Sequence, residues 1–228
     1  MKKMVKSLSP IVLGALVCFL LANSQFVLAA GNSTFHQTIN PGTLATDIRS
    51  ASSTPVTSPS VSMSAKTFSF ACQSGGSAST GTFGTNAERI YVDNPDGADN
   101  GWNLTIAATG GASALWANGG ATNKFDFNDS SGSGCTDGDS DTFGGQLTIN
   151  PTTATTTTDY SGSSTTGITF GSSSSFSSST PITLVNASAG SSDIWRGYVT
   201  GIGLSQTIPA EIPADAYSIN LTLTVTAL

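Results

Sequence analysis

The most constraining feature of the sequence is a strict alternation of apolar and polar side chains over residues 217–226. The apolar members are Tyr217, Ile219, Leu221, Leu223 and Val225, and every residue between them is Ser, Asn or Thr. Side chains of a β-strand point alternately to its two faces, so this period of two places the apolar set on one face. We therefore expect a strand that buries this face and completes the core sheet.

Shorter strand-like runs recur along the chain and are separated by clusters of Gly, Asn, Asp and Ser, which favour turns. Beyond the N-terminus, no capped stretch of helical period exceeds about ten residues. The sequence therefore predicts an all-β fold with a single β-sandwich-like domain. The Ser/Thr-dense stretches 152–166 and 172–180 are expected to be long loops or weak edge strands. The other expected strands cover residues 35–39, 44–48, 68–72, 89–92, 102–108, 146–150, 182–186 and 194–207.

The N-terminus has the pattern of a secretory signal peptide. Three lysines precede an apolar run over residues 10–22, and the small residue Ala29 with Val27 suits cleavage before residue 30. The run is shorter than the roughly 20 residues that a membrane span requires. We expect a signal peptide over residues 1–29, a single domain over 30–228, and a secreted mature protein without a transmembrane anchor.

The charge of the exported chain argues against some partners. Only five basic residues remain after removal of the signal peptide, against fourteen acidic ones, so the net charge is −9. A chain of this charge repels phosphate backbones and anionic membrane surfaces. Nucleic acid is therefore not an expected partner.

Two cysteines, Cys72 and Cys135, remain after export to a compartment where disulfides persist. We expect them to form a disulfide. Closing a loop of this length stabilises a fold by about 4 kcal/mol in the chain-entropy model. The alternative is two buried free thiols.

Three segments of the chain carry a resemblance to a known family. Residues 92–104 read as an apolar strand, an Asp-containing turn and then Gly-Trp-x-Leu, in which the last two named residues are Trp102 and Leu104. Residues 41–44 read Pro-Gly-x-Leu, and residues 204–209 precede the alternating terminal run. Together these segments resemble the WxL-type bacterial surface proteins.

The resemblance implies a secreted β-rich domain on the bacterial cell surface, held noncovalently by cell-wall peptidoglycan or by other surface proteins. It also implies that Trp102 and Leu104 take part in binding. The chain departs from the family in its terminal strand, where residues 223–225 read Leu-Thr-Val in place of a second Trp-x-Leu. Any contact that the distal tryptophan makes in the family is therefore missing here.

The three tryptophans have alternative interpretations that the sequence leaves open. Trp102 follows a turn on a predicted strand, where an aromatic side chain packs in a core or contacts a ligand. Trp116 and Trp195 lie outside any clear pattern, and either is a candidate platform for stacking a sugar.

Two groups of acidic residues are candidate calcium sites. Carboxylates that alternate in a flexible turn can converge on one hard cation, and Ca²⁺ prefers oxygen ligands. The EF-hand pattern is not met, because Thr142 and Thr148 occupy its Gly and Glu positions. A solvated acidic loop is the alternative for the first group, and turns closed by the Asp and Asn side chains themselves are the alternative for the second. The first group is Asp126, Asp129, Asp137, Asp139 and Asp141, and the second is Asp93, Asp96 and Asp99.

Catalytic signals are sparse. His36 is the sole histidine, no Gly-x-Ser-x-Gly motif occurs, and no spacing selects a pair of carboxylates for glycoside hydrolysis. We predict no catalytic residues and no enzymatic activity. The expected function is a noncatalytic surface protein, attached noncovalently because no Leu-Pro-x-Thr-Gly sorting motif is present. The alternatives are a carbohydrate-binding adhesin module and an unrecognised hydrolase.

Overall fold

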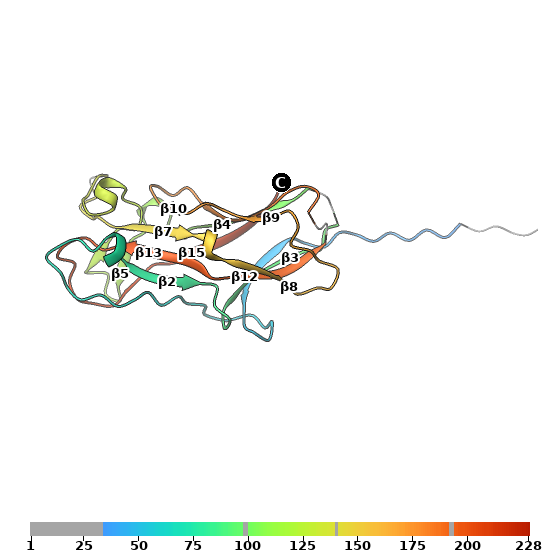
Figure 1. The fold of residues 1–228 in the computed structure, drawn as a ribbon, viewed down its shortest axis with the longest axis horizontal. Helices are drawn as coiled ribbons and strands as arrows, with labels where there is room; N and C mark the ends of the chain where they lie inside the picture. The colour runs from blue at the N-terminus through green and yellow to red at the C-terminus, as the bar shows by residue number, and fades with distance from the viewer. Residues whose placement is uncertain (1–33, 98–99, 140, 192–193) are drawn as a thin grey trace, which may run out of the picture. The chain divides into compact units, whose positions relative to one another are not determined.

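A computed structural model describes residues 34–97, 100–139, 141–191 and 194–228. Residues 40–228 form one compact unit, and residues 34–39 lie outside it. The predicted signal peptide falls outside the described residues. The strands (Figure 1) are β1 Ala45–Arg49, β2 Ser79–Phe83, β3 Arg89–Asn94, β4 Trp102–Ala108, β5 Trp116–Asn118, β6 Lys124–Phe125, β7 Gln146–Asn150, β8 Thr155–Thr158, β9 Ile168–Phe170, β10 Ser174–Ser175, β11 Ile182–Ala187, β12 Trp195–Thr200, β13 Ile202–Thr207, β14 Tyr217–Ser218 and β15 Leu221–Ala227.

The compact unit is all-β, as the sequence predicted. Its helical segments within the described residues are short 3-10 turns, and none is long and apolar enough to cross a membrane. All strand pairs are antiparallel, in sheets ordered β1-β3-β12-β8, β10-β7-β13-β2, β15-β4-β11-β9 and β14-β5-β6. The 3-10 turns are η1 Gly75–Ser77, η2 Gly111–Ser113, η3 Ser131–Ser133 and η4 Pro151–Thr153.

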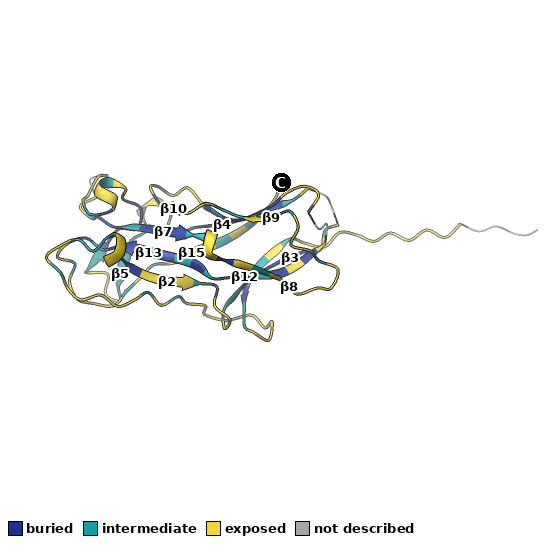
Figure 2. Cartoon of the chain, in the orientation of Figure 1, coloured by how far each residue is buried: buried dark blue, intermediate teal, exposed yellow. Residues whose placement is uncertain are grey.

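The core lies between the three four-stranded sheets, which all contribute buried apolar side chains to one cluster. Strand β4 illustrates the pattern, because its residues alternate between buried and half-buried along its whole length (Figure 2). Trp102 of β4 contacts Trp195 of β12 in the facing sheet, with ring centroids 5.3 Å apart. Both rings are buried. This contact joins two of the three four-stranded sheets.

Gly101 lets β4 begin beside β11. Its φ of +75° belongs to the left-handed region, and a Cβ atom there would lie 2.3 Å from the carbonyl oxygen of Ala187. Only glycine meets both conditions without strain. The glycine before Trp102 is therefore explained by packing, because a side chain there would collide with β11 where the core strand β4 begins.

Most of the predicted strands are present, and two are not. Residues 35–39 form no strand, and their apolar members Phe35 and Ile39 are 93% and 89% exposed. Residues 68–72 also run as irregular chain, with Phe70 exposed. In neither case does a partner strand among the described residues complete a ladder, and a strand needs such a partner to satisfy its backbone. The Ser/Thr-dense stretches contain β8 and β10, each at the edge of its sheet.

The terminal alternating run is split and lies at a sheet edge. Tyr217 belongs to β14, which pairs with β5, whereas residues from Leu221 onward form β15, which pairs with β4. Leu221, Leu223 and Val225 are half-buried and the residues between them are exposed. The predicted alternation is confirmed, but the expected burial is incomplete, because the apolar face of β15 lies beside an open groove.

The disulfide between Cys72 and Cys135 is confirmed, with the two Cα atoms 5.6 Å apart. It ties the irregular segment before β2 to the loop that follows η3. The two attachment points are 63 residues apart in sequence, so the bond restrains a long loop of the unfolded chain.

Truncating a leucine should cost more unfolding free energy in the closed core than at the open edge. Leu104→Ala on β4 should lower the free energy of unfolding by about 2 to 5 kcal/mol, because Leu104 is fully buried. Leu223→Ala on the neighbouring β15 should cost roughly half as much, because part of that side chain is already in solvent. Urea unfolding of dilute protein, followed by circular dichroism, measures both.

Thr224→Ala on the exposed face of β15 is the matched control and should be nearly neutral. Equal losses for Leu104→Ala and Leu223→Ala would contradict the open edge.

Candidate functional site

The acidic loop between β6 and β7 brings five aspartates together. It includes η3, and it is tied down by the disulfide at Cys135. The backbone N–H of Asp126 donates to the carbonyl of Gly144 at 2.7 Å, and that of Asp129 donates to Gly145 at 3.0 Å. These bonds fold the two ends of the loop against each other, so that residues sixteen and eighteen apart in sequence become neighbours.

Carboxylate oxygens of Asp126, Asp129 and Asp139 all lie within 4.8 Å of one another. Asp126 and Asp129 are buried, and Asp139 is exposed. We name these three residues the inner carboxylates. They are close enough for a single cation to bind all three, and their hard oxygen atoms suit Ca²⁺.

Asp126 is the most unusual of the three. Its Oδ1 accepts hydrogen bonds from the backbone N–H groups of Phe127 and Asn128, at 2.6 and 3.3 Å, but its buried Oδ2 has no partner. Burial raises the pKa of Asp126 to about 6, the charges of Asp141 and Asp139 add to the rise, and the two N–H donors oppose it. A buried carboxylate oxygen without a partner is costly, and a bound cation would offset that cost.

Asp129 is held in place by the loop. Its Oδ1 accepts from the N–H of Ser131 at 2.8 Å and its Oδ2 from the N–H of Gly138 at 2.7 Å. Each carboxylate oxygen has more than one lone pair, so these bonds orient Asp129 and leave room for a cation.

A second, exposed group consists of Asp137, Asp139 and Asp141, whose oxygens also lie within 4.8 Å of one another. Here the carboxylates close turns, because Asp137, Asp139 and Asp141 each accept from a backbone N–H two residues later. The structure thus shows the features of both earlier interpretations. The outer group has the turns expected of a solvated acidic loop, and the inner carboxylates have the unpaired oxygen expected of a cation site.

Gly145 permits the close packing of this loop. Its φ is +135°, and a Cβ atom would lie 2.0 Å from the carbonyl oxygen of Asp126. A side chain at this position would push Asp126 away from the other inner carboxylates.

The second predicted calcium turn is arranged differently. Both oxygens of Asp93 accept from arginines, one from Arg49 of β1 at 2.7 Å and one from Arg196 of β12 at 2.8 Å. These guanidinium groups already balance the charge of Asp93 and join three strands of one sheet. Asp96 does not belong to either group of converging carboxylates among the described residues, and Asp99 falls outside those residues.

The structure places the tryptophans in distinct environments. Trp102 and Leu104, the residues singled out by the family resemblance, have no exposed surface and pack in the core. Trp195 is 1% exposed, which removes it as a platform for a sugar. Trp116 is half-buried and lies in the wall of a surface recess.

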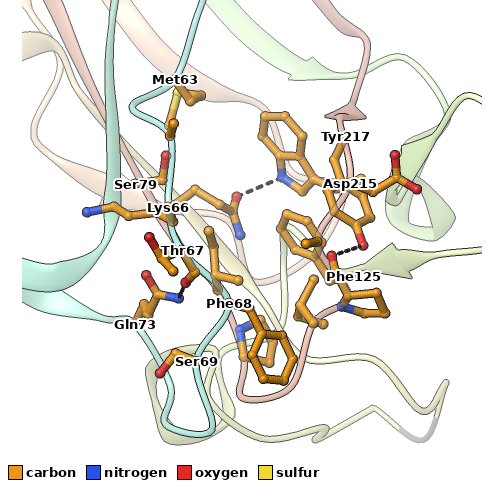
Figure 3. A pocket seen from close by; sticks show the side chains of 18 of the residues that line it. Met63, Lys66, Thr67, Phe68, Ser69, Gln73, Ser79, Phe125, Asp215 and Tyr217 are labelled. Carbon is orange, nitrogen blue, oxygen red and sulfur yellow. Dashed lines mark hydrogen bonds between the residues drawn. The ribbon is translucent and has the colours of Figure 1, made fainter.

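The recess around Trp116 has a volume of about 300 Å³ (Figure 3). The rings of Trp116 and Phe125 stack with centroids 5.8 Å apart and an angle of 8° between their planes. Tyr217 contacts Phe125 edge-on, and its hydroxyl donates to the carbonyl of Pro213. The rest of the wall is mixed, with apolar side chains such as Phe68 and Ile212 and with polar ones that include Lys66, Gln73, Ser79 and Asp215.

Gln206 links this recess to the acidic loop. It is 2% exposed, its Oε1 accepts from the indole N–H of Trp116 at 2.8 Å, and its Nε2 donates to the carbonyl of Asp126 at 3.1 Å. One buried side chain therefore fixes both the tryptophan ring and the backbone of an inner carboxylate.

Trp116 was predicted from the sequence as a candidate sugar platform, but the residues that surround its ring in the recess were not predicted. Phe125, Gln206 and Tyr217 come from β6, β13 and β14, which are far apart in the sequence. No local spacing marks such a set, because the sheet pairing brings the strands together. Comparisons with protein-family models, with curated proteins and with solved structures gave no match.

Calcium should stabilise the protein through the inner carboxylates. Extracellular modules bind Ca²⁺ with dissociation constants of about 0.1 to 1 mM, so 10 mM calcium should add about 1 to 3 kcal/mol to the free energy of unfolding. For a domain of this size that gain corresponds to a rise of several degrees in melting temperature. Calorimetric melting of chelator-treated protein, with and without calcium, measures the effect.

Two substitutions identify the group responsible. Asp126→Asn should abolish most of the calcium effect, whereas Asp137→Asn, which belongs only to the outer group, should preserve it. Asp215→Asn, at the recess, is a control for nonspecific screening. A melting curve that calcium leaves unchanged, with no heat on titration, would mean that the segment is a solvated acidic loop.

Proposed function

We propose that this chain is a secreted, noncatalytic protein of the bacterial cell surface that attaches noncovalently to wall peptidoglycan or to neighbouring surface proteins. The observation that carries the proposal is the recess around Trp116, which combines an aromatic stack with hydrogen-bonding groups. Aromatic faces stack on the apolar faces of sugar rings, and the surrounding polar side chains can bond their hydroxyls.

The rigidity of the recess supports a binding role. Gln206 holds the indole of Trp116, and the parallel ring of Phe125 backs it. A ring held in this way loses little conformational freedom when a ligand binds, which favours affinity.

The charged groups of the recess support a noncatalytic role. Asp215 is the single carboxylate among its lining residues, and it accepts hydrogen bonds from Asn118 and Asn123. Those amides and the backbone N–H of Ala216 lower the pKa of Asp215, which makes it a poor general acid. Hydrolysis of a glycosidic bond usually requires two carboxylates on opposite sides of that bond.

The location is supported by the sequence together with the disulfide. Disulfides persist in oxidising compartments outside the cytosol, and the chain begins with the pattern of a secretory signal. The resemblance to WxL-type proteins adds the bacterial wall as the expected surface. The burial of Trp102 means that a wall contact on this chain would use other residues, for which the recess is the candidate.

A second candidate is a carbohydrate-binding adhesin, which the same recess favours. The two functions differ in the glycan that enters it. Wall attachment requires the glycan strands of peptidoglycan, and adhesion requires glycans of another cell.

Pelleting with purified peptidoglycan tests the proposal. The mature protein should sediment with peptidoglycan, and Trp116→Ala should weaken binding several-fold to tenfold, because a stacked aromatic contact contributes about 0.5 to 1.5 kcal/mol beyond its buried area. Tyr160→Ala is the control, since Tyr160 is an exposed aromatic outside the recess.

Protein that stays in the supernatant but binds a glycan array through Trp116 would favour the adhesin. Turnover of glycan or peptide substrates by clean protein would contradict both functions.

A further inference from the structure

The acidic loop and the recess around Trp116 meet on one short stretch of backbone. The ring of Phe125 stacks on Trp116, and the next residue along the chain is Asp126, one of the inner carboxylates. Strand β6 ends at Phe125 and pairs there with Trp116 of β5. A displacement of Asp126 therefore reaches the stacked rings across a single peptide bond.

The side-chain amide of Gln206 is a second connection between the loop and the recess. Its Nε2 donates to the carbonyls of Asp126 and Thr207, at 3.1 and 2.7 Å, and its Oε1 accepts from the indole N–H of Trp116 at 2.8 Å. Only this orientation of the amide satisfies all three groups. Because Gln206 is 2% exposed, water has little access to replace a lost bond, so a shift of the Asp126 carbonyl is passed to the indole.

The disulfide is a third connection. Cys135 belongs to the acidic loop, and Cys72 directly precedes Gln73 in the wall of the recess. The side chain of Gln73 donates to the carbonyl of Thr67 at 2.9 Å, and residues 63–69 line the same recess. The loop that carries the inner carboxylates thus also holds part of the recess wall.

The inner carboxylates lack a counter-charge from the protein. The ion pairs among the described residues involve Asp47 and Asp93 and none of these three carboxylates. Two buried oxygens of the same turn, Asp126 Oδ2 and Asn128 Oδ1, have no hydrogen-bond partner. A divalent cation would supply positive charge to the carboxylates, and Ca²⁺ accepts both carboxylate and amide oxygens as ligands.

The charge of the loop gives the region two arrangements. The oxygens of the inner carboxylates lie within 4.8 Å of one another, so without a cation their mutual repulsion favours a wider loop. A bound cation reverses this force and draws the carboxylates together. The three connections carry the difference between the two arrangements to the ring of Trp116 and to the recess wall.

We propose that a divalent cation at the inner carboxylates, Ca²⁺ by its ligand chemistry, sets the position of the Trp116 ring and thereby the affinity of the recess for its ligand. By thermodynamic linkage, a ligand that favours the closed arrangement also tightens cation binding by the same factor. This inference rests on the proposed function, because it assigns a regulator to the same recess. It goes beyond stabilisation of the fold, since a cation can stabilise the loop without moving the ring.

Magnetic resonance of the indole N–H groups tests the connection without any glycan. Mature protein labelled isotopically at tryptophan is freed of cations and then titrated with calcium. The Trp116 signal, assigned by its loss in Trp116→Phe, should shift as calcium binds. The signals of Trp102 and Trp195 should shift much less, because both rings are packed in the core.

Two exposed aspartates provide a matched pair of variants. Asp139→Asn removes one inner carboxylate and should abolish the shift of the Trp116 signal. Asp137→Asn removes the same charge from the outer group and should preserve the shift. Because both side chains are exposed, neither substitution should disturb folding. The pair separates binding at the inner carboxylates from general screening of the acidic loop.

Gln206→Met tests the route through the amide. It keeps a long side chain in the same place but removes the bonds to Asp126 and Trp116. Calcium should still raise the melting temperature of this variant, while the shift of the Trp116 signal should fall by at least half. If Gln206→Met does not fold, the aspartate pair still decides the question.

Binding of soluble peptidoglycan fragments measures the consequence for affinity. Calcium should tighten their binding to the mature protein about fivefold or more, and it should leave binding to Asp139→Asn unchanged. A titration that raises the melting temperature but leaves the Trp116 signal in place would overturn the inference, as would fragment binding that ignores calcium.

The inference and the proposed function can fail separately. Fragments that bind equally well with and without calcium, and a fixed Trp116 signal, would support wall attachment and remove the regulation. A Trp116 signal that shifts with calcium in a protein that binds no fragments would support the inference and remove wall attachment.

Discussion

The contact between Trp102 and Trp195 joins the two layers on which the rest of the structure depends. Trp102 begins β4, which is flanked by β15 and β11, and Trp195 begins β12 in the facing sheet. Both rings are buried, so they join the layers through large apolar area. The side of the sandwich at β15 is different, because β1 lies beside this strand and the side chains of Leu221, Leu223 and Val225 pack against the core from its edge. There the apolar face is half-exposed and borders a groove, so the sandwich is closed along one side and open along another.

The acidic loop and the aromatic recess form one connected region. Gln206 bonds to the indole of Trp116 and to the backbone of Asp126; the second bond is buried and the first is partly buried. A cation held by the inner carboxylates would fix the position of Asp126, and through Gln206 it would restrain the ring of Trp116. Calcium would then act as a support for the binding surface as well as for the fold.

The sequence predicted those parts of the structure that depend on local pattern. The limits of β4 follow from the alternation of its residues, and the disulfide follows from the expected export of the chain. Asp126, whose Oδ2 has no partner, belongs to one of the predicted acidic groups. The recess was not predictable, because β5, β6, β13 and β14 meet only through sheet pairing. The error at Phe35 and Ile39 has a different cause. Apolar residues at the two ends of a short polar run favour a strand, but they do not report whether a partner strand is available to complete its ladder.

The central claim is that the sandwich is open along β15, whose outer backbone groups form no ladder with another described strand. Amide hydrogen exchange of dilute, monomeric protein tests it residue by residue. The outward amides of Leu221, Leu223 and Val225 should exchange quickly, while those of Thr222 and Thr224, bonded to β4, should be protected. Equal protection of both sets in the monomer would show that the edge is already paired and would contradict the account.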